Sequence, residues 1–91
     1  MTGYSYFAAS QKLAEMIKTT IDANLTDEEA QALACGEVDS FLLKVESPLL
    51  NDLYEVGLQF REWLQDFDIR QKDNAYNTAR TDKLRRWLQS H

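Results

Sequence analysis

Apolar residues recur at spacings of three and four along four segments of the chain, which is the pattern of amphipathic helices that share a core. The segments cover approximately residues 5–23, 27–46, 48–67 and 74–89. The connections between them are short, which favours antiparallel neighbours, and three glycines and one proline are few for a β protein with many tight turns. The sequence therefore predicts an all-α fold, in which residues 1–91 form a small single-domain antiparallel bundle of about four helices.

The same spacings predict which side chains form the core. One group has two interpretations: Tyr4, Tyr6 and Phe7 either plug the end of the core or form an exposed aromatic contact patch. The predicted inward positions are Tyr6, Leu13, Met16, Ile17 and Ile21 in the first helix, Ala30, Leu33, Ala34, Val38, Phe41, Leu42 and Val45 in the second, Leu49, Leu50, Leu53, Val56, Gly57, Phe60, Trp63, Leu64 and Phe67 in the third, and Tyr76, Ala79, Leu84, Trp87 and Leu88 in the last.

Local signals mark the helix boundaries. Thr26 and Glu29 have the spacing of a capping box, in which each side chain accepts from the backbone N–H of the other residue. Proline fits the first turn of a helix, so a helix is expected to begin at Pro48. Further signals are Ser47 as the N-cap before Pro48, Asp73 or Asn74 as the cap of the last helix, and residues 67–72, which fit either a helix tail or a loop.

The charge is uneven along the chain. The formal net charge is −5, which argues against a nucleic-acid partner because phosphates attract Lys and Arg. Residues 1–69 contain thirteen Asp or Glu and four Lys or Arg. Residues 70–91 contain two Asp or Glu and six Lys or Arg. Either the basic end lies across the acidic body and relieves its self-repulsion, or the chain has two separate electrostatic contact surfaces.

Candidate catalytic chemistry is scarce. The single histidine is His91, the last residue of the sequence, so Ser–His and Cys–His pairings are not expected. Cys35 has no basic residue near it in sequence and is expected to be an ordinary buried or half-buried thiol. The Glu-x-x-His motifs of di-metal bundles are missing. We therefore expect no enzyme activity, no cofactor and no metal site.

The location in the cell is also an expectation. The sequence has no apolar run of the length needed to cross a membrane, its start lacks the features of a signal peptide, and one cysteine cannot form an internal disulfide. A cytoplasmic protein without membrane contact is expected.

The third helix carries the most specific surface pattern. Polar residues alternate spacings of three and four beside its apolar seam, which places them in one stripe. The stripe is either a solvated face that aids solubility or an anionic surface that meets a cationic groove of a partner. A second acidic line, Glu28, Asp39 and Glu46, is predicted on the outer face of the second helix. The stripe consists of Asp52, Glu55, Gln59, Glu62 and Asp66, without lysines at helical pairing distance.

Tyr54 and Leu58 lie beside this stripe in the helical register, with Leu58 almost opposite the predicted core. A single exposed leucine is common. A tyrosine and a leucine bordered by acidic residues also have the composition of a small protein-binding patch or a dimer contact.

The order of elements resembles a known type of small helical protein. A capped acidic helix is followed by the start Ser47-Pro48-Leu49-Leu50 and by a short terminal helix, an order similar to that of the colicin D immunity family. That resemblance implies an acidic helical bundle that blocks a basic RNase toxin. It covers topology and charge, and the basic segment from Arg70 to Arg86 departs from it. A phage inhibitor of a bacterial nuclease complex, of the anti-CRISPR type, would share the same properties.

These observations lead to three hypotheses. The first is a non-enzymatic inhibitor, of immunity or anti-defence type, whose acidic helical surface occupies a cationic site on a nuclease or nuclease complex. The second is a helical adaptor or homodimerising scaffold that docks through Tyr54, Leu58 and the amino-terminal aromatics. The third is a DNA-binding regulator that uses Arg80, Lys83, Arg85 and Arg86.

Overall fold

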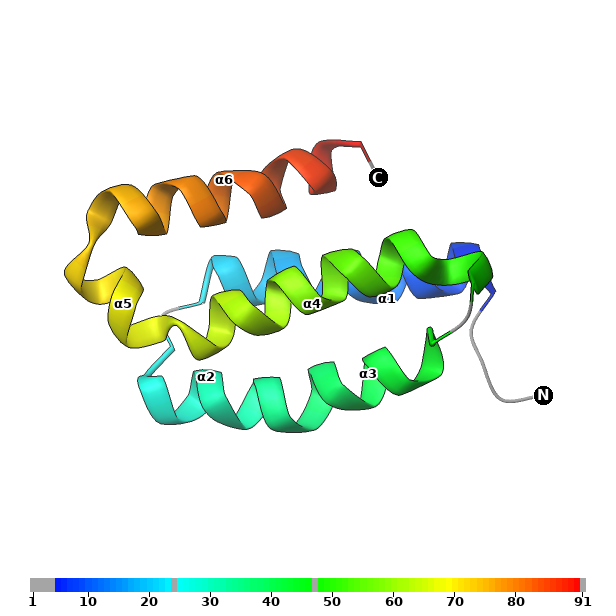
Figure 1. Cartoon of the computed structure of the whole chain (residues 1–91), viewed down its shortest axis with the longest axis horizontal. Coiled ribbons are helices and arrows are strands. Elements are labelled where there is room, and N and C mark those ends of the chain that lie inside the picture. Colours follow the sequence, from blue (N-terminus) through cyan, green and yellow to red (C-terminus); the bar gives the residue numbers. More distant parts are fainter. Residues whose placement is uncertain (1–4, 24, 47, 91) are drawn as a thin grey trace.

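The computed structural model describes residues 5–23, 25–46 and 48–90, and within these ranges the chain is helical with no strand. Four rods follow one another in antiparallel order, with a short helix at one corner (Figure 1). The all-α prediction is therefore confirmed. The elements are α1 (Tyr6–Ile21), α2 (Asp27–Leu33), the π-helical turn η1 (Ala34–Val38), α3 (Asp39–Lys44), the 3₁₀ turn η2 (Pro48–Leu50), α4 (Asn51–Gln65), α5 (Phe67–Lys72) and α6 (Asn74–Gln89).

Side-chain caps begin the helices where the sequence places polar residues. The capping box is present, because Thr26 Oγ1 accepts from Glu29 N at 3.1 Å and Glu29 Oε1 accepts from Thr26 N at 3.0 Å. Asp73 Oδ1 accepts from Tyr76 N at 3.0 Å, so of the two candidate caps for α6 it is Asp73 that caps the helix. The proposed cap at Ser47 lies outside the described residues.

The second predicted helix forms as one rod with a π-helical turn in its middle. α2, η1 and α3 continue into one another from Asp27 to Lys44. Cys35, in the π-helical turn, is exposed, which contradicts the expectation of a buried or half-buried thiol. In this turn the Ala34 side chain points into the core. Cys35, the next residue, points in a different direction around the helix axis and reaches solvent.

The third predicted helix begins later than expected. Residues Pro48–Leu50 form a 3₁₀ turn, and the α-helix starts at Asn51. A 3₁₀ turn rotates successive side chains by more than an α-helix does, which changes the register. Leu50 consequently faces the core, whereas Leu49 is 86% exposed, so the prediction that Leu49 is an inward residue is wrong.

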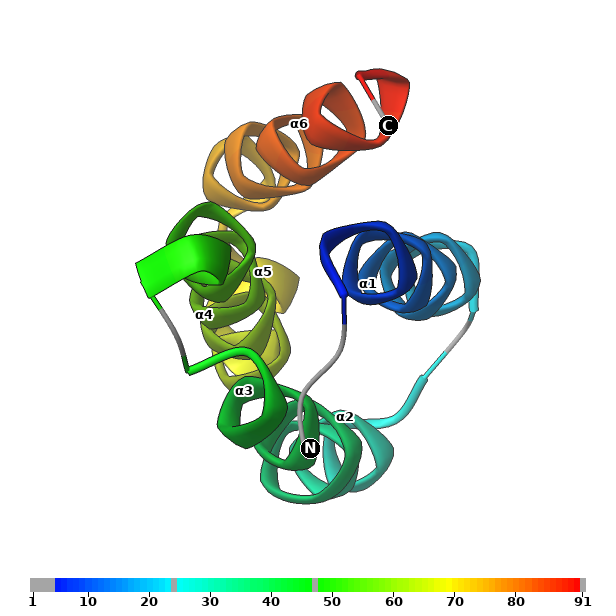
Figure 2. The ribbon, with the colours of Figure 1, turned by 90° about the vertical axis from the view of Figure 1, so that its right-hand side faces the viewer.

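α4 is the central helix. It packs against α1, α2, α3 and α6, and the end-on view shows the other rods arranged around it (Figure 2). Its fully buried side chains are Leu53, Phe60 and Leu64. They belong to the single hydrophobic core that the helices share. Gly57 faces α3 so closely that a Cβ at this position would lie 2.8 Å from Leu42 Cδ2. The sequence places Gly57 among the inward positions, and the absence of a side chain there lets α3 approach α4 closely.

The last helix packs by most of its predicted apolar residues and by two polar residues in addition. Ala79 is exposed, contrary to prediction, and Leu84 is the buried apolar residue of α6. Two polar side chains, Asn77 and Thr81, are half-buried because they accept hydrogen bonds from groups on α5 and α4. α6 is thus held by polar contacts as well as by its apolar stripe.

The amino-terminal aromatics do not plug the core. Tyr6 is 44% exposed and Phe7 is 72% exposed, and Tyr4 lies outside the described residues. Both described side chains stand in the first turn of α1, at the end of the bundle where α3 ends and α4 begins. The alternative interpretation, an exposed aromatic patch, agrees with their positions. No helix in the described part of the chain is long and apolar enough to cross a membrane.

Candidate functional site

The polar stripe predicted on α4 is its solvent-facing side. Asp52, Glu55 and Glu62 are exposed, and Gln59 and Asp66 are half-buried. Because α4 is surrounded by other helices, this stripe is the narrow part of its surface that reaches solvent. The sequence pattern therefore located the outer face of the central helix correctly.

Most carboxylates of the stripe have partners within the molecule. The Tyr6 hydroxyl donates to Asp52 Oδ2 at 2.6 Å, and the Tyr76 hydroxyl donates to Asp66 Oδ2 at 2.6 Å. Arg80 Nη2 lies 3.9 Å from Glu62 Oε2. The sequence suggested carboxylates without cationic neighbours, which is wrong for Glu62 because its partner comes from α6.

These contacts connect three helices. The hydrogen bond to Asp52 raises the pKa of Tyr6, with burial and the charge of Asp52 as smaller causes. The bond ties the first turn of α1 to the first turn of α4. The bonds of Glu62 and Asp66 tie the other end of α4 to α6. Glu55 is the stripe carboxylate for which no side-chain hydrogen bond or ion pair is found in the described part of the chain.

An arginine that the sequence placed in the basic end of the chain belongs to the core instead. Arg70 is 8% exposed, and its guanidinium lies 3.7 Å from the centre of the Trp63 ring. Its Nε donates to the Trp63 carbonyl oxygen at 2.8 Å, and Nη1 lies 3.4 Å from Asn77 Oδ1. Burial lowers the pKa of Arg70, and the nearby charge of Asp66 acts in the opposite sense. The position of Arg70 just after Trp63 and Phe67, at spacings of seven and three, is the signal that sequence analysis passed over.

The other basic residues of the last segment divide between two environments. Arg80 lies against Glu62 and above the Tyr76 ring, whereas Lys72, Lys83, Arg85 and Arg86 are exposed. Arg70 and Arg80 therefore fit the interpretation in which the basic end covers the acidic body. The exposed four leave a smaller basic surface on α5 and α6.

Tyr54 and Leu58 are less exposed than their register suggested. Both are half-buried and pack against the hydrophobic core. The prediction that Leu58 lies almost opposite the core is wrong, because α2 and α3 cover the flank of α4 on which it stands. The Arg61 side chain on the same flank shows this cover, since its Nε lies 2.6 Å from Asp39 Oδ1.

Tyr54 nevertheless contributes to a surface groove. A shallow groove of about 550 Å³ is lined by Glu46, Pro48, Asn51 and Tyr54, where α3 gives way to α4. Two strongly exposed leucines lie close to its lining residues in the chain: Leu43, three residues before Glu46, is 74% exposed, and Leu49, next to Pro48, is 86% exposed. Sequence analysis missed both, although Leu43 lies off the inward register set by Phe41, Leu42 and Val45.

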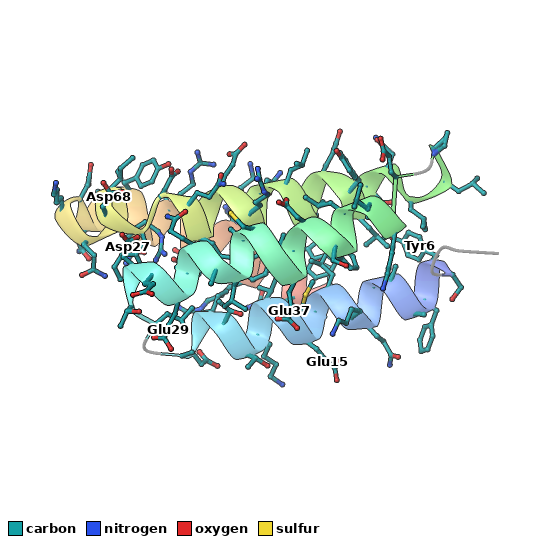
Figure 3. The ribbon with its side chains drawn as sticks, turned by 90° about the horizontal axis from the view of Figure 1, so that it is seen from below. Tyr6, Glu15, Asp27, Glu29, Glu37 and Asp68 are labelled. Atoms are coloured by element: carbon teal, nitrogen blue, oxygen red, sulfur yellow. The ribbon has the colours of Figure 1, made fainter. Side chains whose placement is uncertain are left out.

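The acidic line predicted on the second helix is partly neutralised. Glu28 and Glu46 are exposed, but Asp39 is half-buried and forms the ion pair with Arg61. Other exposed carboxylates gather on the α1 and α2–α3 side of the molecule (Figure 3). They include Glu15, Asp27, Glu29 and Glu37.

The unbalanced charge belongs to this side of the molecule. Residues 1–46 contain eight Asp or Glu and three Lys or Arg, while residues 47–91 contain seven of each. The whole excess of −5 therefore lies in the part of the chain that forms α1, α2 and α3.

The described residues offer little for cofactor or metal binding. Among them no group of three or more His, Cys, Asp or Glu side chains is placed to hold a metal ion. His91 lies outside the described residues, and Cys35 is an exposed free cysteine. Two features bear on contact with a partner: the exposed carboxylates of α2 and η1, and the groove beside Tyr54.

Similarity to known proteins gives no functional information for this chain. No protein-family model matches the chain, and neither a curated protein nor a solved structure matches it significantly.

Proposed function

We propose that this chain is a non-catalytic, protein-binding inhibitor, of immunity or anti-defence type, whose acidic helical surface occupies a cationic site on a nuclease or nuclease complex. Such an inhibitor acts in the cytoplasm, where its target handles nucleic acid. It needs no cofactor, since it works by filling the site that phosphates would otherwise enter.

The observation that carries the proposal is the uncompensated charge on one side of a rigid helical body. Three carboxylates of the α4 stripe, Asp52, Glu62 and Asp66, contact Tyr6, Arg80 and Tyr76 and so help to hold the helices together. The carboxylates of α2 and η1 are exposed, and these two elements contain no Lys or Arg. Self-repulsion of such a surface costs stability, and a cationic partner relieves it.

The test is to isolate the partner and measure its activity. The tagged chain is used to capture proteins from an extract of the source organism at low ionic strength, and a captured nuclease is then purified. We expect stoichiometric loss of its nuclease activity on adding the chain, and weaker binding as salt rises, because opposite charges steer association.

Competition provides the control. Heparin, a polyanion that imitates the nucleic-acid backbone, should displace the chain from a cationic site. If the captured partner binds equally well at high salt and in the presence of heparin, the contact is not electrostatic and the inhibitor proposal is wrong.

A second function is favoured by the exposed apolar side chains. Phe7, Leu43 and Leu49 are all more than two-thirds exposed, which suits a helical adaptor or a homodimer. Sedimentation of the chain alone distinguishes the two functions. Self-association that persists at high salt and is lost in Leu49→Ser favours the scaffold, whereas a monomer at every salt concentration favours the inhibitor.

A further inference from the structure

We propose that the groove between α3 and α4 is the docking site for a basic amphipathic segment of the partner protein, which seats its apolar side chains on Leu43, Leu49 and Tyr54 and its Lys or Arg side chains on Glu46 and Glu55. This inference rests on the proposed function and names the partner's chemistry.

The apolar part of the argument is exposure. Leu49 and Leu43 are the two most exposed large apolar side chains among the described residues, at 86% and 74%. Leu49 follows Pro48 directly and Leu43 precedes Glu46 by three residues, and both Glu46 and Pro48 line the groove of about 550 Å³. Pro48 and the half-buried ring of Tyr54 give this groove rigid apolar walls. A rigid apolar patch with a tyrosine is the composition of an interface centre.

The electrostatic part is the charge around that patch. Glu46 lines the groove, and Glu55 lies one helical turn beyond Asn51, which also lines it. Among the described residues, neither carboxylate has a side-chain hydrogen bond or ion pair. Asp52 adds a third negative charge beside Asn51, although the Tyr6 hydroxyl already binds it. An occupant with Lys or Arg on both sides of an apolar core matches this arrangement.

A second copy of this chain is a poorer occupant. Two copies would each bring the net charge of −5, and the groove itself is acidic, so like charges would meet. A basic segment of another protein removes the repulsion.

The experiment uses the full chain and a defined probe, a short helical peptide of leucine and lysine at amphipathic spacing. Its binding is measured by fluorescence anisotropy, and its site is mapped by ¹H–¹⁵N chemical-shift changes. We expect shift changes centred on residues 43–55. A peptide of the same pattern with glutamate in place of lysine should not bind.

Two pairs of variants separate the apolar and the charged contributions. Leu43→Ser with Leu49→Ser should weaken peptide binding by roughly tenfold or more, as for hot-spot side chains. Glu46→Gln with Glu55→Gln should weaken it several-fold at low salt and little at high salt. All four side chains lie on the surface, so circular dichroism should show wild-type helicity in both variants.

Matched controls lie on other faces. Phe7→Ser removes an exposed apolar side chain from the separate groove between α1 and the end of α6, and Glu15→Gln with Glu28→Gln removes two exposed carboxylates. If these controls weaken binding as much as the groove variants, or if the shift changes centre on Phe7 and Leu88, the inference is wrong. Self-association abolished by Leu49→Ser would also overturn it, in favour of a second copy as occupant.

The outcome for the docking site is distinct from the outcome for the inhibitor function. If a nuclease is captured and inhibited but its affinity is unchanged by the groove variants, the inhibitor function is supported and the docking site is wrong. If the peptide binds at residues 43–55 but no cationic partner is inhibited, the docking site is supported and the inhibitor function is wrong.

Discussion

At the scale of single residues, the side chains that set this structure apart are those that combine burial with polarity. Arg70 lies under α6 with its guanidinium stacked on Trp63, and Thr81 Oγ1 accepts from Trp63 Nε1 at 2.9 Å. Composition alone assigns Arg70 to a basic surface. The assignment to the core needed the chain to turn at α5, a turn that the sequence left open between a helix tail and a loop.

The first prediction concerns this arginine. Arg70→Ala should lower the free energy of unfolding by about 2–3 kcal/mol, because the change removes a desolvated cation–π contact and a charge-assisted hydrogen bond to a backbone carbonyl. Urea denaturation followed by circular dichroism measures the loss. Arg70→Lys is the control, since it keeps the charge but loses the planar group. Full stability in that variant would show that the charge of Arg70, and not its stacking on Trp63, stabilises the packing of α5 against α4 and α6.

The second prediction concerns the capping box of α2. Thr26→Ala should cost about 1 kcal/mol, the usual value for a lost N-cap. Hydrogen bonds from the backbone and side chain of Thr26 lower the pKa of Glu29. A carboxyl whose pKa is lower in the folded state stabilises the fold above its unfolded pKa, and that stabilisation disappears as the pH falls through the folded value.

Glu29→Gln isolates this titration, because glutamine can still accept the reciprocal hydrogen bond but carries no charge. The advantage of the wild type over Glu29→Gln should be complete at neutral pH and should vanish below the ordinary titration range of glutamate. Thermal unfolding at a series of pH values checks this. An advantage that is constant down to strongly acidic pH would contradict the assignment.

At the scale of elements, periodicity predicted the four rods and local sequence predicted the caps of α2 and α6, but neither fixed the register at the joints. The 3₁₀ turn at Pro48–Leu50 rotated Leu49 into solvent. α6 was predicted from its apolar residues, yet Asn77 and Thr81 take inward positions because buried donors on Arg70 and Trp63 need acceptors. Such inward polar positions depend on hydrogen-bond partners in other helices. The spacing of apolar residues within one helix gives no information about those partners.

The third prediction uses the two described helical glycines as a matched pair. Gly36→Ala places a methyl group where no atom lies within 4 Å, so it should stabilise the protein by about 0.5–1 kcal/mol through helix propensity. Gly57→Ala gains the same propensity but brings its Cβ to 2.8 Å from Leu42 Cδ2, and the overpacking should make it destabilising by about 1 kcal/mol. Equal stabilisation by both substitutions in urea unfolding would mean that α3 and α4 do not pack closely.

At the scale of the whole molecule, the fold brings partners from distant parts of the chain to carboxylates that have no lysine at helical pairing distance in the sequence. The stripe on α4 was selected because its carboxylates had no lysine at helical pairing distance. The structure brings Tyr6, Tyr76 and Arg80 to it from α1 and α6. The position of the stripe on the surface was therefore predictable, and its use in tertiary contacts was not. Whether the stripe residues also contact a partner stays a prediction, with Glu55 as the stripe carboxylate that has no side-chain hydrogen bond or ion pair among the described residues.

The last prediction compares two triple substitutions that remove the same charge. Asp52→Asn, Glu62→Gln and Asp66→Asn together should lower stability by about 1–2 kcal/mol, because two tyrosine hydroxyls lose charged acceptors and Arg80 loses its neighbour. Glu15→Gln, Glu28→Gln and Glu37→Gln together should keep or slightly raise stability, because these exposed carboxylates lie in the part of the chain that holds the excess negative charge. Thermal unfolding at low and high salt separates the causes. Salt should remove the gain of the second variant, which is long-range repulsion, and leave most of the loss of the first, which is local hydrogen bonding. Equal behaviour of the two variants at both salt concentrations would show that net charge alone matters and that the α4 stripe has no part in holding α1 and α6.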